Sequence, residues 1–200
     1  MLLEPKSDNL DAKTDEELVA LIFGNQELYL HLMRRYEAKI LRYIMRISGL
    51  NHDDAEDVLQ EVFIKAYKNL HDFDPGLKFS SWLYRIAHNE TVSHFRKTKS
   101  RPQIVRSQAE DGDGLLEKIA VDPDFQRLFD GEIVKRDVRQ ALDGLDEKYR
   151  TALILRYMEE RDYGEISDIL EKPMGTVATL INRAKERLRN EINKRGQAPQ

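Results

Sequence analysis

Residues 163–188 read YGEISDILEKPMGTVATLINRAKERL, and their pattern predicts how the second half of the chain folds. Apolar residues recur at helical spacing on both sides of Pro173, and proline cannot continue the interior of a helix. The pattern therefore predicts a short helix, a tight turn at residues 171–173, and a second helix that opens at about Gly175. Such a pair is a helix-turn-helix. The residues expected to face the core are Ile166, Ile169, Leu170, Val177, Leu180, Ile181 and Ala184.

The outer face of the second helix carries short polar side chains and one arginine. Thr176, Thr179, Asn182 and Arg183 fall on this face, and side chains of these types can read base edges in a DNA major groove. Lys185 follows, with Arg187 and Arg189 close by, as expected for contacts with phosphates. An ordinary helical hairpin with a charged face would have the same core residues.

The rest of the chain is also helical in its periodicity. Thr14 and Glu17 have the spacing of a capping box, and Gly49 is placed to end a long helix. Asp53 or Asp54 is expected to open the next helix. No stretch alternates like a strand, so the fold class is all-α. The predicted core positions before Pro75 are Leu18, Leu21, Ile22, Tyr29, Leu32, Tyr36, Ile40, Tyr43, Ile44, Ile47, Ala55, Val58, Leu59, Val62, Phe63, Ala66, Tyr67 and Leu70.

Residues 79–97, FSSWLYRIAHNETVSHFRK, carry a second stripe besides the apolar one. Ser80 or Ser81 could cap this helix, and Leu83, Ile86, Ala87 and Phe95 suit its core. Aromatic rings stack on unpaired bases, amides and guanidinium groups bond base edges, and basic residues hold the backbone. The stripe therefore indicates single-stranded DNA, although Trp82 taken alone would suit a core. Its candidate residues are Phe79, Trp82, Arg85, Asn89, Arg96 and Lys97.

The helix DAEDVLQEVF at residues 54–63 has an outer side that its core does not explain. Asp57, Gln60 and Glu61 point outward, with Ile64 beside them. An exposed apolar residue framed by acids can mark a partner-binding face, and a solvated helix surface is the plainer alternative.

Charge is distributed in blocks although the chain has a net charge of −4. Residues 84–106 hold six basic residues and one acid, and residues 172–195 hold seven basic residues and two acids. Between them, residues 107–132 hold eight acids and two basic residues, together with Gly112, Gly114 and Pro123. Two basic segments around an acidic linker are typical of a nucleic-acid binder with two contact sites.

Composition excludes several classes of function. The chain has no cysteine, which removes disulfides, thiolate zinc sites and thiol redox sensing. No run is long and apolar enough for a membrane span, and residues 1–9 do not resemble a signal peptide, so a cytoplasmic protein without membrane insertion is expected.

Two blocks of sequence together resemble a known family. AEDVLQEVFIKAYKNLHDF (55–73) followed by FSSWLYRIAHN (79–89), and LDEKYRTALILRYMEERDYGEISDIL (145–170) followed by GTV and RAKERLR, are similar to the extracytoplasmic-function (group IV) sigma factors of bacterial RNA polymerase. The resemblance covers about three-quarters of the chain, in order. It implies a transcription initiation factor without catalysis, cofactor or metal.

The resemblance also implies three segments. Residues 1–100 would be sigma region 2, which binds core polymerase at its clamp and recognises and melts the −10 element. Residues 101–131 would be a flexible linker threading toward the active-site cleft. Residues 132–196 would be sigma region 4, a −35 reader that also meets the polymerase flap.

Individual residues receive roles by the same resemblance. Asp57, Gln60, Glu61 and Ile64 would contact the clamp, and residues 71–81 with Trp82, Arg85 and Asn89 would hold a flipped, single-stranded −10 base. Duplex DNA at −35 would meet Arg156 at a phosphate, with the recognition helix supplying the base contacts. An anti-sigma factor is a further partner that the family implies.

One departure from the family concerns the recognition helix. Many members place a basic residue, Ser and another basic residue after GTV, where this chain has Ala178, Thr179 and Leu180. The helix loses two positive charges, which leaves the strength of −35 recognition open. Leu180 could instead be buried.

Two other classes of function remain as alternatives. A conventional helix-turn-helix regulator would act without polymerase, but it leaves the aromatic stripe and DVLQEVF unexplained. An enzyme with a carboxylate-rich metal site could use His52, Asp53, Asp54, Glu56 and Asp57. These acids also lie where a helix start favours negative charge. The sequence has no second His–Asp cluster that could complete a metal site with them.

Overall fold

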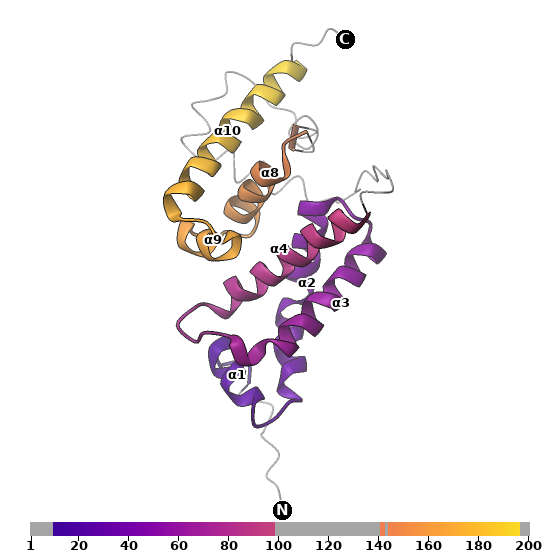
Figure 1. The fold of residues 1–200 in the computed structure, drawn as a ribbon, viewed down its shortest axis with the longest axis vertical. Coiled ribbons are helices and arrows are strands. Elements are labelled where there is room, and N and C mark those ends of the chain that lie inside the picture. Colours follow the sequence, from indigo (N-terminus) through magenta and orange to yellow (C-terminus); the bar gives the residue numbers. More distant parts are fainter. Residues whose placement is uncertain (1–9, 99–140, 143, 197–200) are drawn as a thin grey trace, which may run out of the picture.

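The protein is described by a computed structural model for residues 10–98, 141–142 and 144–196, and helices and turns account for the regular structure of those ranges. Figure 1 shows two groups of helices, one from each half of the chain, stacked along the long axis. The prediction of an all-α fold with two helical units is confirmed. The predicted linker at 101–131 lies outside the described residues.

The first unit consists of four α-helices and one short 3₁₀ turn. They are α1 (Asp15–Ile22), α2 (Leu28–Ser48), α3 (His52–Lys68), η2 (Leu70–Asp72) and α4 (Phe79–Thr98). Thr14 and Glu17 form the predicted capping box at α1, and Gly49 ends α2 in the left-handed conformation with φ 68°. The N-cap of α3 is Asn51, whose side chain accepts from the Asp54 N–H, so the expectation of Asp53 or Asp54 as the opening residue was wrong.

The core of this unit lies between α2, α3 and α4. Every predicted core position on α2 is buried, because its apolar residues repeat with the helical period. Two predicted core positions on other helices, Leu21 of α1 and Tyr67 of α3, are instead exposed. Two inward tyrosines also find polar partners: Tyr29 donates to the Phe63 carbonyl and Tyr36 to the Asp15 carboxylate.

The second unit contains the predicted helix-turn-helix. Its helices are α8 (Glu147–Leu153), the π-helical turn η3 (Ile154–Met158), α9 (Tyr163–Leu170) and α10 (Met174–Gly196). Asp162 and Glu165 form a capping box at α9. Glu171 then adopts the left-handed conformation with φ 53°, which turns the chain before Pro173. Val177, Ile181 and Ala184 are buried as predicted.

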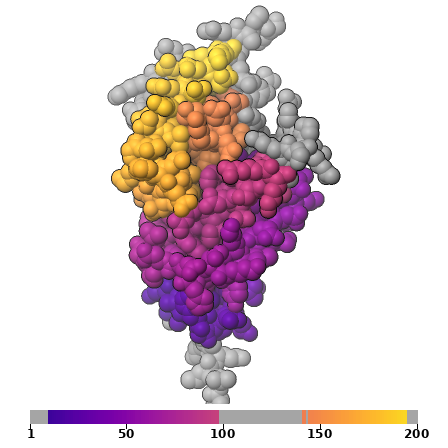
Figure 2. All heavy atoms as spheres, in the orientation of Figure 1, coloured from indigo at the N-terminus to yellow at the C-terminus, as the bar shows by residue number. Residues whose placement is uncertain are grey.

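The two units pack directly on each other, which the sequence did not predict. Helix α9 lies against α4, and one buried cluster continues from the first unit into Leu155, Ile166 and Ile169 of the second. In the space-filling view the second unit sits on the first without a gap (Figure 2). Among the described helices, none combines the length and apolarity that a membrane span requires.

Candidate nucleic-acid interface

The start of α4 is fixed by a residue far away in sequence. The Phe79 N–H donates to Glu16 Oε1 of α1 at 2.8 Å, so a carboxylate caps the helix from outside. The expectation of a cap at Ser80 or Ser81 was therefore wrong, because both serines lie inside the first turn. In the preceding loop, the Gly76 N–H donates to Asp74 Oδ1 at 2.8 Å. The end of residues 71–81 and the helix after it are thus held by α1.

Phe79 and Trp82 point into the protein rather than outward. Both rings pack with Phe73, at centroid distances between 5.5 and 5.6 Å, and Phe79 also meets Tyr36 edge-on at 5.7 Å. Only 6% of Trp82 is exposed. The expectation that these two rings lie on the DNA-facing surface is corrected by this packing, since burial of an aromatic side chain contributes about 1.5–3 kcal/mol. A base could stack on them only if the cluster opened.

The polar members of the predicted stripe do reach the surface. Asn89, Arg96 and Lys97 are exposed, and Arg85 is half-buried. Arg85 and Asn89 lie one turn apart on one side of α4, because residues four apart share a helix face. This part of the stripe can meet a nucleic-acid strand without rearrangement of the first unit.

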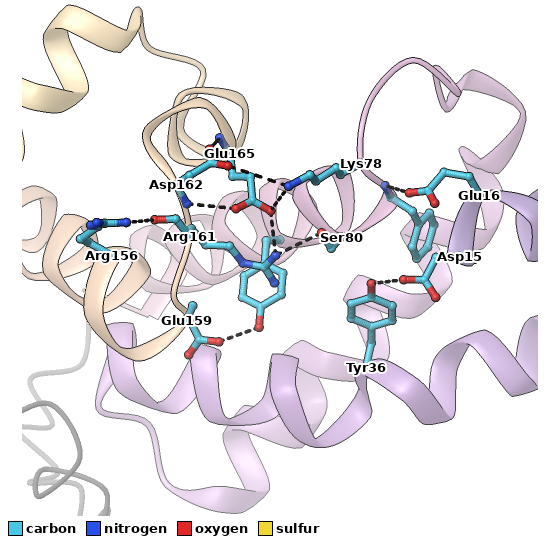
Figure 3. A network of polar contacts seen from close by, with 12 residues as sticks. Asp15, Glu16, Tyr36, Lys78, Ser80, Arg156, Glu159, Arg161, Asp162 and Glu165 are labelled. Atoms are coloured by element: carbon cyan, nitrogen blue, oxygen red, sulfur yellow. Dashed lines mark hydrogen bonds and ion pairs between the residues drawn. The ribbon is translucent and has the colours of Figure 1, made fainter. Parts of the chain in front are cut away.

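Arg161 is the central cation where the second unit meets α4. Its guanidinium carbon lies 4.4 Å from the centroid of the Tyr84 ring, and Nη1 donates to Ser80 Oγ at 3.1 Å and to Glu165 Oε1 at 3.2 Å. Figure 3 shows it between the two units, facing Ser80 and Glu165. Burial alone would lower the pKa of Arg161, but the hydrogen bond with Tyr84 and the charge of Glu165 raise it above its ordinary value.

Glu159 of the second unit supplies a negative charge at the same boundary. Its carboxylate accepts from the Tyr84 hydroxyl at 2.6 Å and from Arg46 Nη1 at 2.8 Å, and only 8% of its side chain is exposed. Burial and the neighbouring Glu159 charge raise the pKa of Tyr84, so its hydroxyl stays protonated and serves as a donor. Arg46, Tyr84 and Arg161 were not among the predicted site residues. Each of them has a partner in the other unit, and no local motif marks them.

Two further cations, Lys78 and Arg85, form ion pairs beside Arg161 and Glu159. Lys78 Nζ lies 3.2 Å from Glu165 Oε1 and 3.9 Å from Asp162 Oδ2, and Arg85 Nη1 lies 3.8 Å from Glu171 Oε1. Burial would raise the pKa of Glu165, but the Asp162 N–H, Lys78 and Arg161 together lower it. Arg85, a predicted DNA contact, is therefore engaged by a carboxylate of the second unit.

The outer face of α3 is exposed where it was predicted to be. Asp57, Gln60 and Glu61 are all exposed, and Ile64 is 48% exposed. Tyr67, assigned to the core from its spacing, lies on the surface and contacts Tyr29 at a centroid distance of 4.9 Å. The resulting face mixes acids with apolar side chains, which suits a protein partner.

The recognition helix presents most of its predicted residues. Thr176, Thr179, Asn182 and Arg183 are exposed, although the Thr179 hydroxyl donates to the Gly175 carbonyl at 2.9 Å. Lys185 is the exception.

Lys185 does not lie on the outer face of α10. The residue is 8% exposed, and its Nζ lies 5.7 Å from the centroid of the Tyr157 ring. The expectation of an exposed phosphate contact is corrected by this cation–π packing. Leu180 is half-buried between two hydrophobic clusters, the one shared by both units and a second one that contains Leu153 and Leu188. Ala178 is half-buried as well.

Arg156 remains exposed on the second unit. It donates through Nη1 to the Arg161 carbonyl at 3.1 Å (Figure 3). Its guanidinium carbon also lies 5.5 Å from the centroid of the Tyr163 ring. The guanidinium is thereby oriented while still open to solvent. Elsewhere, the described ranges hold no group of three or more His, Asp or Glu residues placed to bind a metal ion.

Comparison with known proteins assigns each unit to a family. Sigma-70 region 2 matches residues 32–101, and Sigma-70 region 4 matches residues 135–188. The chain is 36% identical to the ECF RNA polymerase sigma factor SigW of Bacillus subtilis, over 84% of this chain and 91% of that protein. It is 37% identical to the RNA polymerase sigma-H factor of Pseudomonas aeruginosa, over 88% of this chain and 93% of the other.

A solved structure shares the fold. CnrH in complex with the cytosolic domain of CnrY matches with a TM-score of 0.64 and 24% identity, covering 91% of this chain and 99% of that one. The overlap spans both units and supports the all-helical architecture.

Proposed function

This chain belongs to the extracytoplasmic-function sigma factors of RNA polymerase, and on that premise we propose how its two units divide the work of initiation. As a sigma factor it directs core polymerase to specific promoters. Residues 1–100 form the unit that binds core polymerase and recognises and melts the −10 element. Residues 132–196 form the unit that reads the −35 element, and residues 101–131 join them.

In the first unit, the outer face of α3 is the polymerase contact. Asp57, Gln60 and Glu61 present carboxylates and an amide to the clamp, and Ile64 adds apolar area. The support is their common exposure on one helix whose opposite face fills the core.

The −10 strand meets α4. Arg85 and Asn89 are the inner contacts, and Arg96 and Lys97 hold the backbone farther along the helix. The support is the exposure of Asn89, Arg96 and Lys97 and the place of Arg85 one turn before Asn89, together with the match to Sigma-70 region 2. Phe79 and Trp82 act as stacking platforms only when the aromatic cluster with Phe73 opens.

In the second unit, the recognition helix α10 enters the major groove. Thr176, Thr179, Asn182 and Arg183 face the bases, and Arg156 meets a phosphate. The support is the exposure of all five side chains beside the observed helix-turn-helix.

We also propose three further properties that are typical of this family. The chain acts without catalysis of its own, in the cytoplasm, where polymerase and promoters are found. It is also open to control by an anti-sigma factor. CnrH was solved with the cytosolic domain of CnrY, and a Bartonella quintana sigma factor RpoE with the anti-sigma factor NepR.

The observation that carries this function is the match of both units, in order, to the two sigma-70 regions. A helix-turn-helix regulator acting alone would account for the second unit and leave the first without a role.

Gel filtration of the folded chain with purified core polymerase tests the proposal. We expect the two to elute together as one complex. Separate elution, with tight binding of duplex promoter DNA by the chain alone, would favour the regulator instead.

A further inference from the structure

At the contact between the two units, acidic side chains of the second unit pair with basic side chains of the first. Glu159, Glu165 and Glu171 of the second unit meet Arg46, Lys78 and Arg85 of the first at 2.8, 3.2 and 3.8 Å. One cation of the second unit also reaches the first unit, since Arg161 donates to the Ser80 hydroxyl and covers the Tyr84 ring. The first unit therefore offers a positive surface and the second unit supplies most of the negative charge.

The Glu159 carboxylate occupies a built anion site. Arg46 supplies a charged N–H donor and Tyr84 a hydroxyl donor, at 2.8 and 2.6 Å. The side chains of Glu159 and Arg46 are 8% and 15% exposed, so the pair is largely shielded from solvent. An arginine with a neutral hydroxyl donor is also the chemistry that holds a phosphate oxygen. A phosphodiester presents the same negative oxygens that Glu159 presents here.

The two flanking carboxylates lie on the surface assigned to promoter DNA. Glu171 faces Arg85, a proposed −10 contact, and Glu165 faces Lys78 just before α4. Asn89, Arg96 and Lys97 lie farther along α4 and are exposed. The second unit thus covers the first half of the helix and leaves the second half open.

Backbone geometry brings these carboxylates to α4. The π-helical turn Ile154–Met158 ends at Glu159, and the next residue, Glu160, is left-handed with φ 54°. Glu171 is left-handed with φ 53° at the other end of α9. Left-handed backbone is unusual for glutamate, and it persists where the surroundings hold it. Glu159 and Glu171 are thereby presented at either end of α9.

We propose that Glu159, Glu165 and Glu171 stand in for phosphates of the promoter strand, and that the second unit closes over the −10 surface of the first until the two separate. This inference rests on the proposed function for the identity of the strand, but the closure itself does not depend on it. Binding of single-stranded DNA and packing of α9 on α4 are then mutually exclusive. Arg46 and Tyr84 become additional phosphate contacts once Glu159 leaves.

Closure is measured first, in the full chain without polymerase. The chain has no cysteine, so Ala38→Cys on α2 and Asn190→Cys on α10 allow a donor and an acceptor dye to be attached selectively. The test variant is Glu159→Gln/Glu165→Gln/Glu171→Gln. Glutamine keeps the shape of each side chain and can still serve in the capping box at α9. We expect lower energy transfer in this variant than in the parent.

DNA binding is measured next, by the anisotropy of a fluorescein-labelled single-stranded oligonucleotide of mixed sequence. If the closed form holds about nine-tenths of the molecules, opening raises the apparent affinity roughly tenfold. Removal of three negative charges would also raise affinity without any specific contact. The matched control is therefore Glu27→Gln/Glu37→Gln/Glu186→Gln, which removes the same charge from exposed positions outside the contact. We expect the control to keep the parent's energy transfer and to bind clearly more weakly than the test variant.

Either of two results overturns the proposal. Unchanged energy transfer in the test variant would show that these carboxylates do not hold the units together. Reduced transfer with an affinity equal to that of the control would show that they do not occupy a strand-binding surface. Failure of the proposed function is a separate result, because it would appear as loss of complex formation between the parent chain and core polymerase.

Discussion

Trp82 and Asn89 lie about two turns apart on α4, yet their surroundings differ completely. Trp82 packs with Phe73 and Phe79, whereas Asn89 is exposed. The two residues were predicted to act together on an unpaired base. Their placement separates a packing role from a contact role, and mutation can distinguish the two.

Trp82→Ala should lower the free energy of unfolding by about 3–5 kcal/mol, the usual loss for a large buried aromatic side chain. Asn89→Ala should change it by no more than about 0.5 kcal/mol, since the side chain is exposed. Denaturant unfolding measures the first effect, and permanganate footprinting of the promoter measures melting. We expect Asn89→Ala to reduce melting more than initial promoter binding. Normal melting by this variant would remove Asn89 from the −10 site.

His88 should make stability depend on pH. Burial lowers its pKa from the ordinary value of 6.5; the charge of Glu147 opposes this shift and that of Lys172 adds to it. The His88 Nδ1 lies 3.4 Å from the Tyr43 hydroxyl. The unfolded chain then binds a proton more readily than the folded one as pH falls from 6.5 toward the folded pKa. The free energy of unfolding therefore decreases over that window, by at most about 1.4 kcal/mol per pH unit.

His88→Gln should reduce this fall in the free energy of unfolding at acid pH. Denaturant unfolding at several pH values measures it. The exposed His52→Gln is the control and should leave the fall in place. An unchanged pH dependence in His88→Gln would mean that the neutral imidazole is not what the fold requires.

At the scale of helices, α3 separates its two faces sharply. Val58, Val62 and Ala66 fill the core, while Asp57 and Glu61 lie outside. The outer face can therefore be altered without disturbing the packing. This separation is what allows a helix to be both structural and a docking surface.

Asp57→Lys/Glu61→Lys should weaken binding to core polymerase while leaving the melting temperature nearly unchanged, because exposed substitutions usually change stability by only about 0.5 kcal/mol. Gel filtration with core polymerase and thermal unfolding give the two readings. Unaltered complex formation would contradict the assignment of α3 to the clamp.

At the start of α10, mutation can likewise distinguish a position that contacts DNA from one that packs in the core. Ala178→Arg should steepen the dependence of promoter affinity on salt, by roughly 0.9 in the logarithmic slope if one phosphate is contacted. Leu180→Arg should instead destabilise the unit by about 1–3 kcal/mol, because Leu180 packs against both clusters. The measurement is affinity of the holoenzyme for one promoter across a salt series. Equal slopes for wild type and Ala178→Arg would place residue 178 away from DNA.

Sequence periodicity predicted buried positions correctly where the helix's own repeat determines which side chains face the core. Tyr36, Ile40 and Tyr43 on α2, and the turn before Pro173, are where it predicted them. It failed where a residue distant in sequence determines the burial or the capping of a side chain or helix. Lys185 is buried beside Tyr157, and Phe79 takes its cap from Glu16.

At the scale of the whole molecule, the packing of the two units depends on contacts between residues far apart in sequence, which no local sequence pattern predicts. Arg46 and Glu159 are separated by 113 positions in sequence, and the π-helical turn that presents Glu159 has no simple sequence signature. Family resemblance located the two units, but not their packing on each other. In this arrangement the second unit covers the Arg85 end of α4. On our proposal that α4 meets the −10 strand, separation of the units is a step in promoter recognition.

The central claim is that this chain makes core polymerase initiate at chosen promoters. Run-off transcription with purified core polymerase on a promoter library tests it directly. We expect discrete transcripts that appear only when the chain is present and that begin downstream of shared −35 and −10 sequences. Transcripts that are the same with and without the folded chain would contradict the account.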